Sequence, residues 1–78
     1  MEIGTKVRVK STASGSDLRF AGRKGIVIEF DPSLRWSTAR ALLAPHQFVC
    51  VHFYPRSGLE RRRGSPISLL DHNSLVAI

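Results

Sequence analysis

The sequence has only one cysteine, Cys50, among its 78 residues, so no disulfide can form within the chain. Small secreted domains usually carry several cysteines, because cross-links stabilise a core that is too small to hold the fold alone. The scarcity of cysteine therefore predicts a reducing compartment, and we expect a cytoplasmic protein.

Long hydrophobic runs are also missing. The first ten residues, MEIGTKVRVK, contain no apolar stretch of the kind that forms the centre of a secretory signal. No run elsewhere approaches the roughly 20 apolar residues that a membrane-spanning helix needs. We therefore expect neither a signal peptide nor a membrane span.

Aromatic residues are few, at 8% of the chain, although 42% of the residues are hydrophobic. A chain of this length buries only about 60% of the surface that its unfolded form exposes. We expect one core and one domain, residues 1–78. Because such a core is small, contact with a partner would add stability, and a homo-oligomer is one way to supply that contact.

Negative charge is scarce as well. The chain has 12 Lys and Arg residues against 6 Asp and Glu residues, which gives a net charge of +6 and a pI near 10.8. Nine of the twelve positive residues are arginines. A basic excess of this size favours acidic partners. We expect the partner to be an acidic protein or RNA, and no membrane.

Five short runs alternate with Gly, Pro and Ser, which is typical of a small all-β domain. In the first run, Thr5 to Lys10, the valines face one way and the three basic side chains face the other, since strand side chains alternate between faces. The other four predicted strands are Ile26 to Phe30, Phe48 to Tyr54, Pro66 to Leu70 and Leu75 to Ile78.

The same alternation predicts the core. A strand that is shifted by one residue turns its whole apolar set outward, so the assignment depends on choosing the correct face of each strand. The expected core residues are Val7, Val9, Ile26, Ile28, Val49, Val51, Phe53, Ile67, Leu69 and Leu75.

The segment from Asp31 to Gln47 fits two structures. Asp31 could cap a helix with Pro32 at its first position, and a modest apolar stripe continues from there. The alternative is a long hairpin tip in which Trp36 packs over one end of the fold. Periodicity leaves both open, a short helix over residues 32–44 and the hairpin tip.

The spacing of the five strands, a long connection after the first and a GxxG turn before the second resemble the SH3-like small barrels. The opening IGTKVRVK, the turn GRKGIV, Trp36 and the ending SLLDHNSLVAI look like the variable chain of ferredoxin-thioredoxin reductase and related accessory subunits of photosynthetic complexes. This resemblance implies a five-stranded SH3-like barrel that binds and stabilises a catalytic partner.

Two other SH3-like families share parts of the pattern. The stretch LRFAGRKGIVIEF is similar to the KOW-type barrels, which implies RNA contact through a basic loop and a glycine turn, although the gap between Val9 and Gly22 is longer here. The strings KVRVKS and VHFYPRSGLER resemble the plasmid-type dihydrofolate reductases. That family's catalytic Gln-Ile-Tyr would fall on Ser, Leu and Leu at residues 68–70, so its activity does not carry over.

Cys50 and His52 are two residues apart and therefore share one face of a strand. A zinc site needs about four ligands at closing geometry, and His46 and His72 complete no CxxC or HxxxH pattern. A Cys–His nucleophile pair would also need a base within reach and an oxyanion site. We expect no metal, no cofactor and no catalysis.

Gly22 and Gly25 enclose Arg23 and Lys24 in a GxxG pattern. Backbone N–H groups in such a turn could cradle a phosphate. The simpler interpretation is a tight turn that needs a positive φ angle. In both interpretations the two cations are candidate contacts for an anion.

Arg61, Arg62 and Arg63 are the most distinctive charged feature, because three adjacent guanidinium groups repel one another and need solvent or an anionic partner. Two interpretations stay open, an ordinary solvated loop and a loop that makes the main anionic contact. The supporting contacts are expected from the exposed face of the first strand, at Lys6, Arg8 and Lys10.

These features predict a non-catalytic basic binding module, an accessory or assembly protein that docks on an acidic protein. The alternative is a KOW-like RNA or ribosome-binding protein, in which Trp36 and Tyr54 would be the aromatic contacts for bases. The third hypothesis is an oligomeric reductase-like enzyme with its site across a pore between copies.

Overall fold

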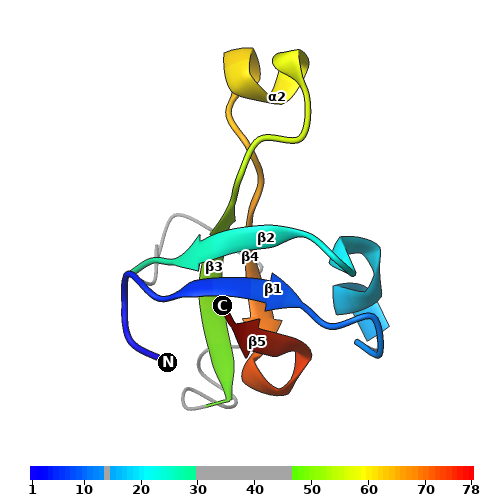
Figure 1. The fold of residues 1–78 in the computed structure, drawn as a ribbon, viewed down its shortest axis with the longest axis vertical. Coiled ribbons are helices and arrows are strands. Elements are labelled where there is room, and N and C mark those ends of the chain that lie inside the picture. Colours follow the sequence, from blue (N-terminus) through cyan, green and yellow to red (C-terminus); the bar gives the residue numbers. More distant parts are fainter. Residues whose placement is uncertain (14, 30–46) are drawn as a thin grey trace.

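The structure is a computed structural model, and it describes residues 1–13, 15–29 and 47–78. Within these ranges short strands are interrupted by two 3₁₀ turns and one short α-helix (Figure 1). In chain order the elements are β1 (Lys6–Val9), η1 (Gly15–Phe20), β2 (Lys24–Val27), β3 (Phe48–Phe53), α2 (Gly58–Arg63), β4 (Ile67–Asp71), η2 (His72–Ser74) and β5 (Leu75–Ala77).

The five strands form one antiparallel sheet in the order β4-β3-β2-β1-β5. The first four strands follow one another as a meander, and β5 returns to pair with β1. Figure 1 shows β1 and β2 running across the direction of β3 and β4, so the sheet is strongly twisted. The predicted mainly β class is confirmed, and each predicted run contains or overlaps a strand.

The core lies on one face of this sheet. Val7, Val9 and Val51 are fully buried there, and Phe53 is 1% exposed. The ring of Phe20, from η1, stacks on the ring of Phe53 with 4.6 Å between the centroids. The alternation in β1 and β3 therefore predicted the inward side chains of these two strands correctly.

The face predicted for β2 is wrong. Val27 is 3% exposed and belongs to the core, whereas Ile26 and Ile28 are only half-buried. The strand has apolar residues on both faces, and pairing decides between them, because Val27 lies directly opposite the buried Val51. The larger isoleucines therefore lie on the opposite, outer face.

The prediction for β4 needs a similar correction. Leu70 is fully buried in the core and lies opposite Val49, which packs against the core only in part. Leu69 is also buried, but it lies opposite Cys50 on the other face of the sheet. Ile67, on that same face, is half-buried. β4 thus has buried side chains on both of its faces, at Leu69 and Leu70.

The two glycines of the GxxG pattern serve different needs. Gly22 has a φ of +81°, which is the turn conformation that glycine adopts without strain. Gly25 lies within β2, where a Cβ atom would come 2.7 Å from the His52 carbonyl oxygen and 2.8 Å from Val51. The second glycine is therefore required by the close approach of β3 and not by a turn.

The arginine run lies in a helix, which corrects the predicted loop. The N-cap of α2 is Ser57, whose Oγ accepts a hydrogen bond of 3.2 Å from the Glu60 N–H. Arginines in the last turn interact favourably with the negative end of the helix, and Gly64 follows with a φ of +93°. Because a helix of six residues is marginal alone, α2 depends on contacts with the rest of the fold.

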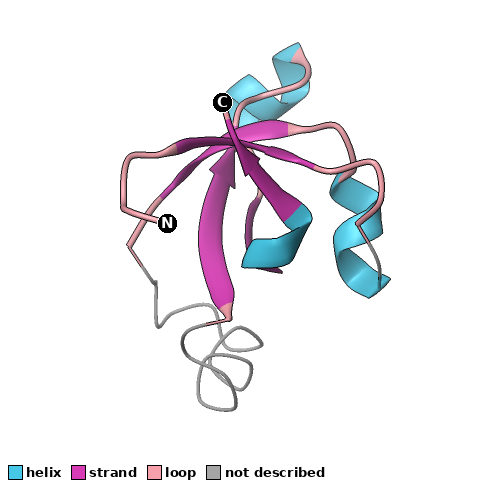
Figure 2. Ribbon diagram, turned by 60° about the horizontal axis from the view of Figure 1, so that its bottom comes forward, coloured by secondary structure: helices cyan, strands magenta, loops and turns pink. Residues whose placement is uncertain are grey.

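A buried carboxylate joins the two 3₁₀ turns. Asp17, in η1, accepts hydrogen bonds from the Asp71 N–H at 3.1 Å and from the Ser74 hydroxyl at 2.9 Å. Figure 2 shows η1 and η2 below the crossing strands and α2 above them. Asp17 thus fixes the end of the molecule that lies away from α2.

The predicted alternatives for residues 32–44, including the position of Trp36, lie outside the described residues. In the part of the chain that the structure describes, no helix is long and apolar enough to cross a membrane.

Candidate anion-binding surface

One row of side chains crosses the outer face of the sheet from β1 to the end of β3. Arg8 lies directly opposite Lys24 in the pairing of β1 with β2. Lys24 in turn lies opposite Tyr54, whose N–H donates a 3.0 Å hydrogen bond to the Lys24 carbonyl oxygen. Since opposite residues of antiparallel strands share a face, the three side chains lie side by side.

Three adjoining hollows follow this row. The first, of about 430 Å³, is lined by Arg8 and Lys10 and shares Gly22 with the second, which has a volume of about 420 Å³. The second contains Lys24 and Tyr54 and shares Pro55 and Arg56 with the third. The third is about 150 Å³ and reaches Arg61 on α2. Together they form a continuous shallow surface from β1 to α2.

This surface, which we call the basic row, collects positive charge. Its exposed or half-exposed cations are Arg8, Lys10, Lys24, Arg56 and Arg61. None of the carboxylates in the described residues lines the three hollows. Like charges that face each other across a pair of strands, as Arg8 and Lys24 do, destabilise the sheet unless an anion or solvent screens them.

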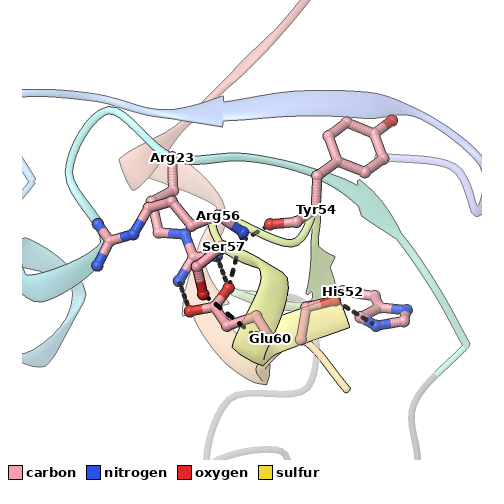
Figure 3. Close-up of polar contacts among 7 residues, drawn as sticks. Arg23, His52, Tyr54, Arg56, Ser57 and Glu60 are labelled. Atoms are coloured by element: carbon pink, nitrogen blue, oxygen red, sulfur yellow. Dashed lines mark hydrogen bonds and ion pairs between the residues drawn. The ribbon is translucent and has the colours of Figure 1, made fainter. Parts of the chain in front are cut away.

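Arg23 differs from the other predicted cations because its side chain is only 8% exposed. Its guanidinium donates to both Glu60 carboxylate oxygens, at 2.7 and 3.5 Å, and to the Tyr54 carbonyl oxygen at 2.9 Å (Figure 3). It also lies 5.3 Å from the centre of the Phe53 ring. The hydrogen-bonding capacity of Arg23 is thus directed inward, toward α2 and β3.

Glu60 is the partner that this arrangement holds on α2. The Arg23 guanidinium and the Arg56 N–H both donate to its carboxylate, and they lower the pKa of Glu60 below the usual range for glutamate. The Glu60 N–H in turn donates to the Ser57 hydroxyl oxygen, which caps the helix. Hydrogen bonds of the Glu60 backbone and of its side chain thus both hold the first turn of α2. The bidentate contact with Arg23 also keeps this carboxylate engaged within the protein.

Tyr54 presents its ring from a backbone that is held on both sides. Its N–H bonds to Lys24 and its carbonyl oxygen accepts from Arg23. The side chain is nevertheless 42% exposed, and Figure 3 shows the ring pointing away from Glu60. The second hollow is therefore lined by an exposed aromatic residue with a hydrogen-bonded backbone, together with two exposed cations, Lys24 and Arg56.

The GxxG turn is not arranged as a phosphate cradle. The Gly22 N–H donates to the Val9 carbonyl oxygen at 2.9 Å, and the Arg23 N–H donates to the Phe20 carbonyl oxygen at 2.9 Å. Both donors are therefore engaged within the protein and do not face a ligand. An anion on this surface would be held chiefly by the exposed cationic side chains.

The predicted site residues come together only in part. Arg8, Lys10, Lys24, Tyr54 and Arg61 line the hollows, while Lys6 lies on the same outer face, opposite Ile26 in the next row. Trp36 lies outside the described residues. Arg23 also lines the second hollow, although its guanidinium is engaged by Glu60. Arg62 and Arg63 are exposed on α2 but line none of these hollows.

Sequence reasoning missed Arg56, which lies between the second and third hollows. A signal for it exists, because Ser57 and Glu60 form the S-x-x-E pattern of a helix start. Recognising that helix would have placed Arg56 just before α2, beside the strand end that carries Tyr54.

Cys50 and His52 share the outer face, as predicted from their spacing. Cys50 is buried opposite Leu69, and the His52 Nε2 lies 3.3 Å from the Ser65 hydroxyl oxygen. Across residues 1–13, 15–29 and 47–78, no three His, Cys, Asp or Glu side chains gather closely enough to hold a metal ion.

Comparison with known proteins returned no match, whether to a family model, to a curated protein or to a solved structure.

Proposed function

We propose that this chain is a non-catalytic binding module that holds an anionic partner on the basic row. The observation that carries this proposal is the gathering of five exposed or half-exposed cations around three adjoining hollows that no described carboxylate lines. Guanidinium groups bind carboxylates and phosphates through paired hydrogen bonds, so such a surface suits an anionic ligand and involves no bond-breaking step.

The Arg23–Glu60 ion pair supports the same proposal. Glu60 is the acidic residue of α2, and a free carboxylate there would compete with an anionic ligand for the nearby cations. Arg23 engages Glu60 most strongly, at 2.7 Å, and the charge of Arg56 acts on this carboxylate to a smaller extent. The basic row therefore keeps most of its positive potential at neutral pH.

A second candidate partner is an acidic protein, and one observation outside the three hollows supports it. Leu59 is 58% exposed on α2, beside the exposed arginines at residues 61–63. Protein interfaces are enriched in arginine around apolar contacts. In this version of the proposal, an acidic protein would contact Leu59 and α2. This chain would then act as the SH3-like accessory subunits do, by binding a partner protein.

Retention on a heparin column tests the proposed function, since heparin is a polyanion without bases or peptide groups. The test variant is Arg8→Gln with Lys24→Gln and Arg56→Gln. The matched control removes the same charge outside the hollows, with Arg19→Gln, Arg62→Gln and Arg63→Gln. We expect the test variant to elute at much lower salt than the control, because it loses contacts that release counterions.

Equal elution of the two triple variants would contradict a defined site, because it would mean that only net charge matters. Circular dichroism spectra of both variants serve as the folding control and should show the same strand content as the native chain.

A further inference from the structure

Tyr54 is the feature of the basic row that charge alone does not explain. An anion-binding surface needs cations and donors, whereas this one places a flat ring, 42% exposed, in the middle hollow. The hydrogen bonds to Lys24 and from Arg23 hold the Tyr54 backbone, so a ligand on the ring would have to order only the two side-chain torsions of Tyr54. The entropic cost of a contact with this ring is therefore small.

The surroundings of the ring restrict what that contact is. The face of an aromatic ring carries negative partial charge, so the carboxylates of an acidic protein gain nothing by lying on it. A nucleobase, in contrast, stacks on such a face whichever of the bases it is, because every base has a flat π-face. Lys24 and Arg56, which share the hollow with Tyr54, are then placed to contact the phosphates next to the stacked base.

The spacing of the row agrees with an extended strand. Neighbouring strands of a sheet lie about 4.8 Å apart, so Arg8 and Tyr54, with Lys24 between them, are separated by roughly 10 Å. The three hollows continue this line from Arg8 and Lys10 to Arg61. A flexible, unpaired chain of nucleotides can follow such a line, because its bases are free to turn toward the protein.

From these observations we infer that the anionic partner is a single-stranded nucleic acid, and that Tyr54 stacks on one of its bases while the cations of the basic row contact its phosphates. This inference rests on the proposed function and names its ligand.

The test is a titration of fluorescently labelled oligouridine of about ten nucleotides, a length within the site sizes of single-strand binding folds. Four proteins are compared: the native chain, Tyr54→Ala, Tyr54→Leu and Tyr54→Phe. We expect the alanine and leucine variants to bind at least about fivefold more weakly, because a stacked base is lost. The phenylalanine variant keeps the ring and should bind within about twofold of the native chain.

Leu18→Ala is the matched control, since Leu18 is 55% exposed on η1 and lines none of the three hollows. Its affinity for oligouridine should equal that of the native chain. A duplex of the same length, whose bases are already paired and stacked, should show no dependence on the ring at residue 54. The leucine variant retains the apolar bulk of the side chain, so it decides the question if the alanine variant does not fold.

Three results would overturn the inference. The first is oligouridine binding that is unchanged in Tyr54→Leu. The second is duplex binding that depends on Tyr54 as strongly as oligouridine binding does. The third is binding of polyglutamate with the same dependence on Tyr54, which would identify an acidic protein as the partner. Each leaves the heparin result standing, whereas equal heparin elution of the two triple variants would remove the proposed function itself.

Discussion

Two neighbouring rows of side chains, one on each face of the same three strands, show contrasting packing. On the inner face, Val7, Gly25 and Phe53 lie opposite one another across β1, β2 and β3, and they leave no space for another atom at Gly25. One residue along each strand, the outer face carries the row that ends at Tyr54, where like charges adjoin and the side chains are exposed. The inner row therefore determines stability, and the outer row is left available for binding.

The largest expected effect is on the inner row, at Phe53. Phe53→Ala removes a ring that is 1% exposed and stacked on Phe20, which leaves a cavity as well as lost burial. We expect a loss of about 3 to 5 kcal/mol in the free energy of unfolding, enough to leave a small domain largely unfolded. Urea denaturation of Phe53→Ala and of the adjacent Tyr54→Ala measures the contrast. Equal losses would mean that the two rows are packed alike.

The next effect distinguishes the two glycines. Gly25→Ala places a Cβ atom 2.7 Å from a backbone oxygen of β3, so the strands must move apart. We expect a destabilisation of about 1 to 3 kcal/mol. Gly22→Ala meets no neighbouring atom but has to adopt a positive φ, which costs about 1 kcal/mol. Thermal unfolding of both variants, with Gly58→Ala as an unhindered control, tests this order. A smaller loss for Gly25→Ala would contradict the close approach.

A third prediction concerns the ion pair that connects the two rows, since Arg23 lies against Phe53 and holds Tyr54 and Glu60. The pKa of Glu60 is lowered in the folded state, so its contribution to stability is complete above the usual glutamate pKa. That contribution is lost as the pH falls through the lowered value. We expect hydrogen exchange in α2 to accelerate over this acidic range in the native chain, in excess of the intrinsic pH dependence.

Glu60→Gln is the control for this pH dependence, because it removes the titrating group. Its α2 should exchange faster at neutral pH and should lack the acidic transition. The same acidic transition in both proteins would assign it to another carboxylate.

The smallest effect on stability is expected on the outer row. Arg8→Gln removes one of two cations that face each other across β1 and β2, so the free energy of unfolding should stay within about 0.5 kcal/mol or rise slightly. Any increase should disappear at about 1 M salt, where the Debye length is about 3 Å. Urea titrations at low and high salt check this. A clear loss of stability at both salt concentrations would mean that Arg8 contributes to packing.

Much of the inner row was predictable from alternation, but the second strand was not. Val7 and Val9 alternate with charged residues, so only one face of β1 could be buried. Around Gly25 both faces of the strand carry residues that could be buried, and the larger isoleucines favoured the wrong one. The register with Val51 decides this, and register depends on pairing with a strand more than twenty residues away.

The outer row was predictable in its charges but not in its geometry. Lys24 and Tyr54 were candidates from residue type alone, whereas their position opposite each other follows from the pairing of β2 with β3. Arg23 could not be distinguished from its neighbour Lys24 by residue type. Its partner, Glu60, lies 37 residues further along the chain.

The amino-acid sequence by itself determined the five strands, the mainly β class and the excess of positive charge, because propensity, alternation and composition are properties of neighbouring residues. Only the tertiary structure decided which face of β2 is buried, which arginine is engaged by Glu60 and which described aromatic ring shares a hollow with exposed cations. The physical reason is that strand pairing brings together residues that are distant along the chain. Hydrogen bonds and ion pairs between such residues then determine which side chains remain exposed for a ligand.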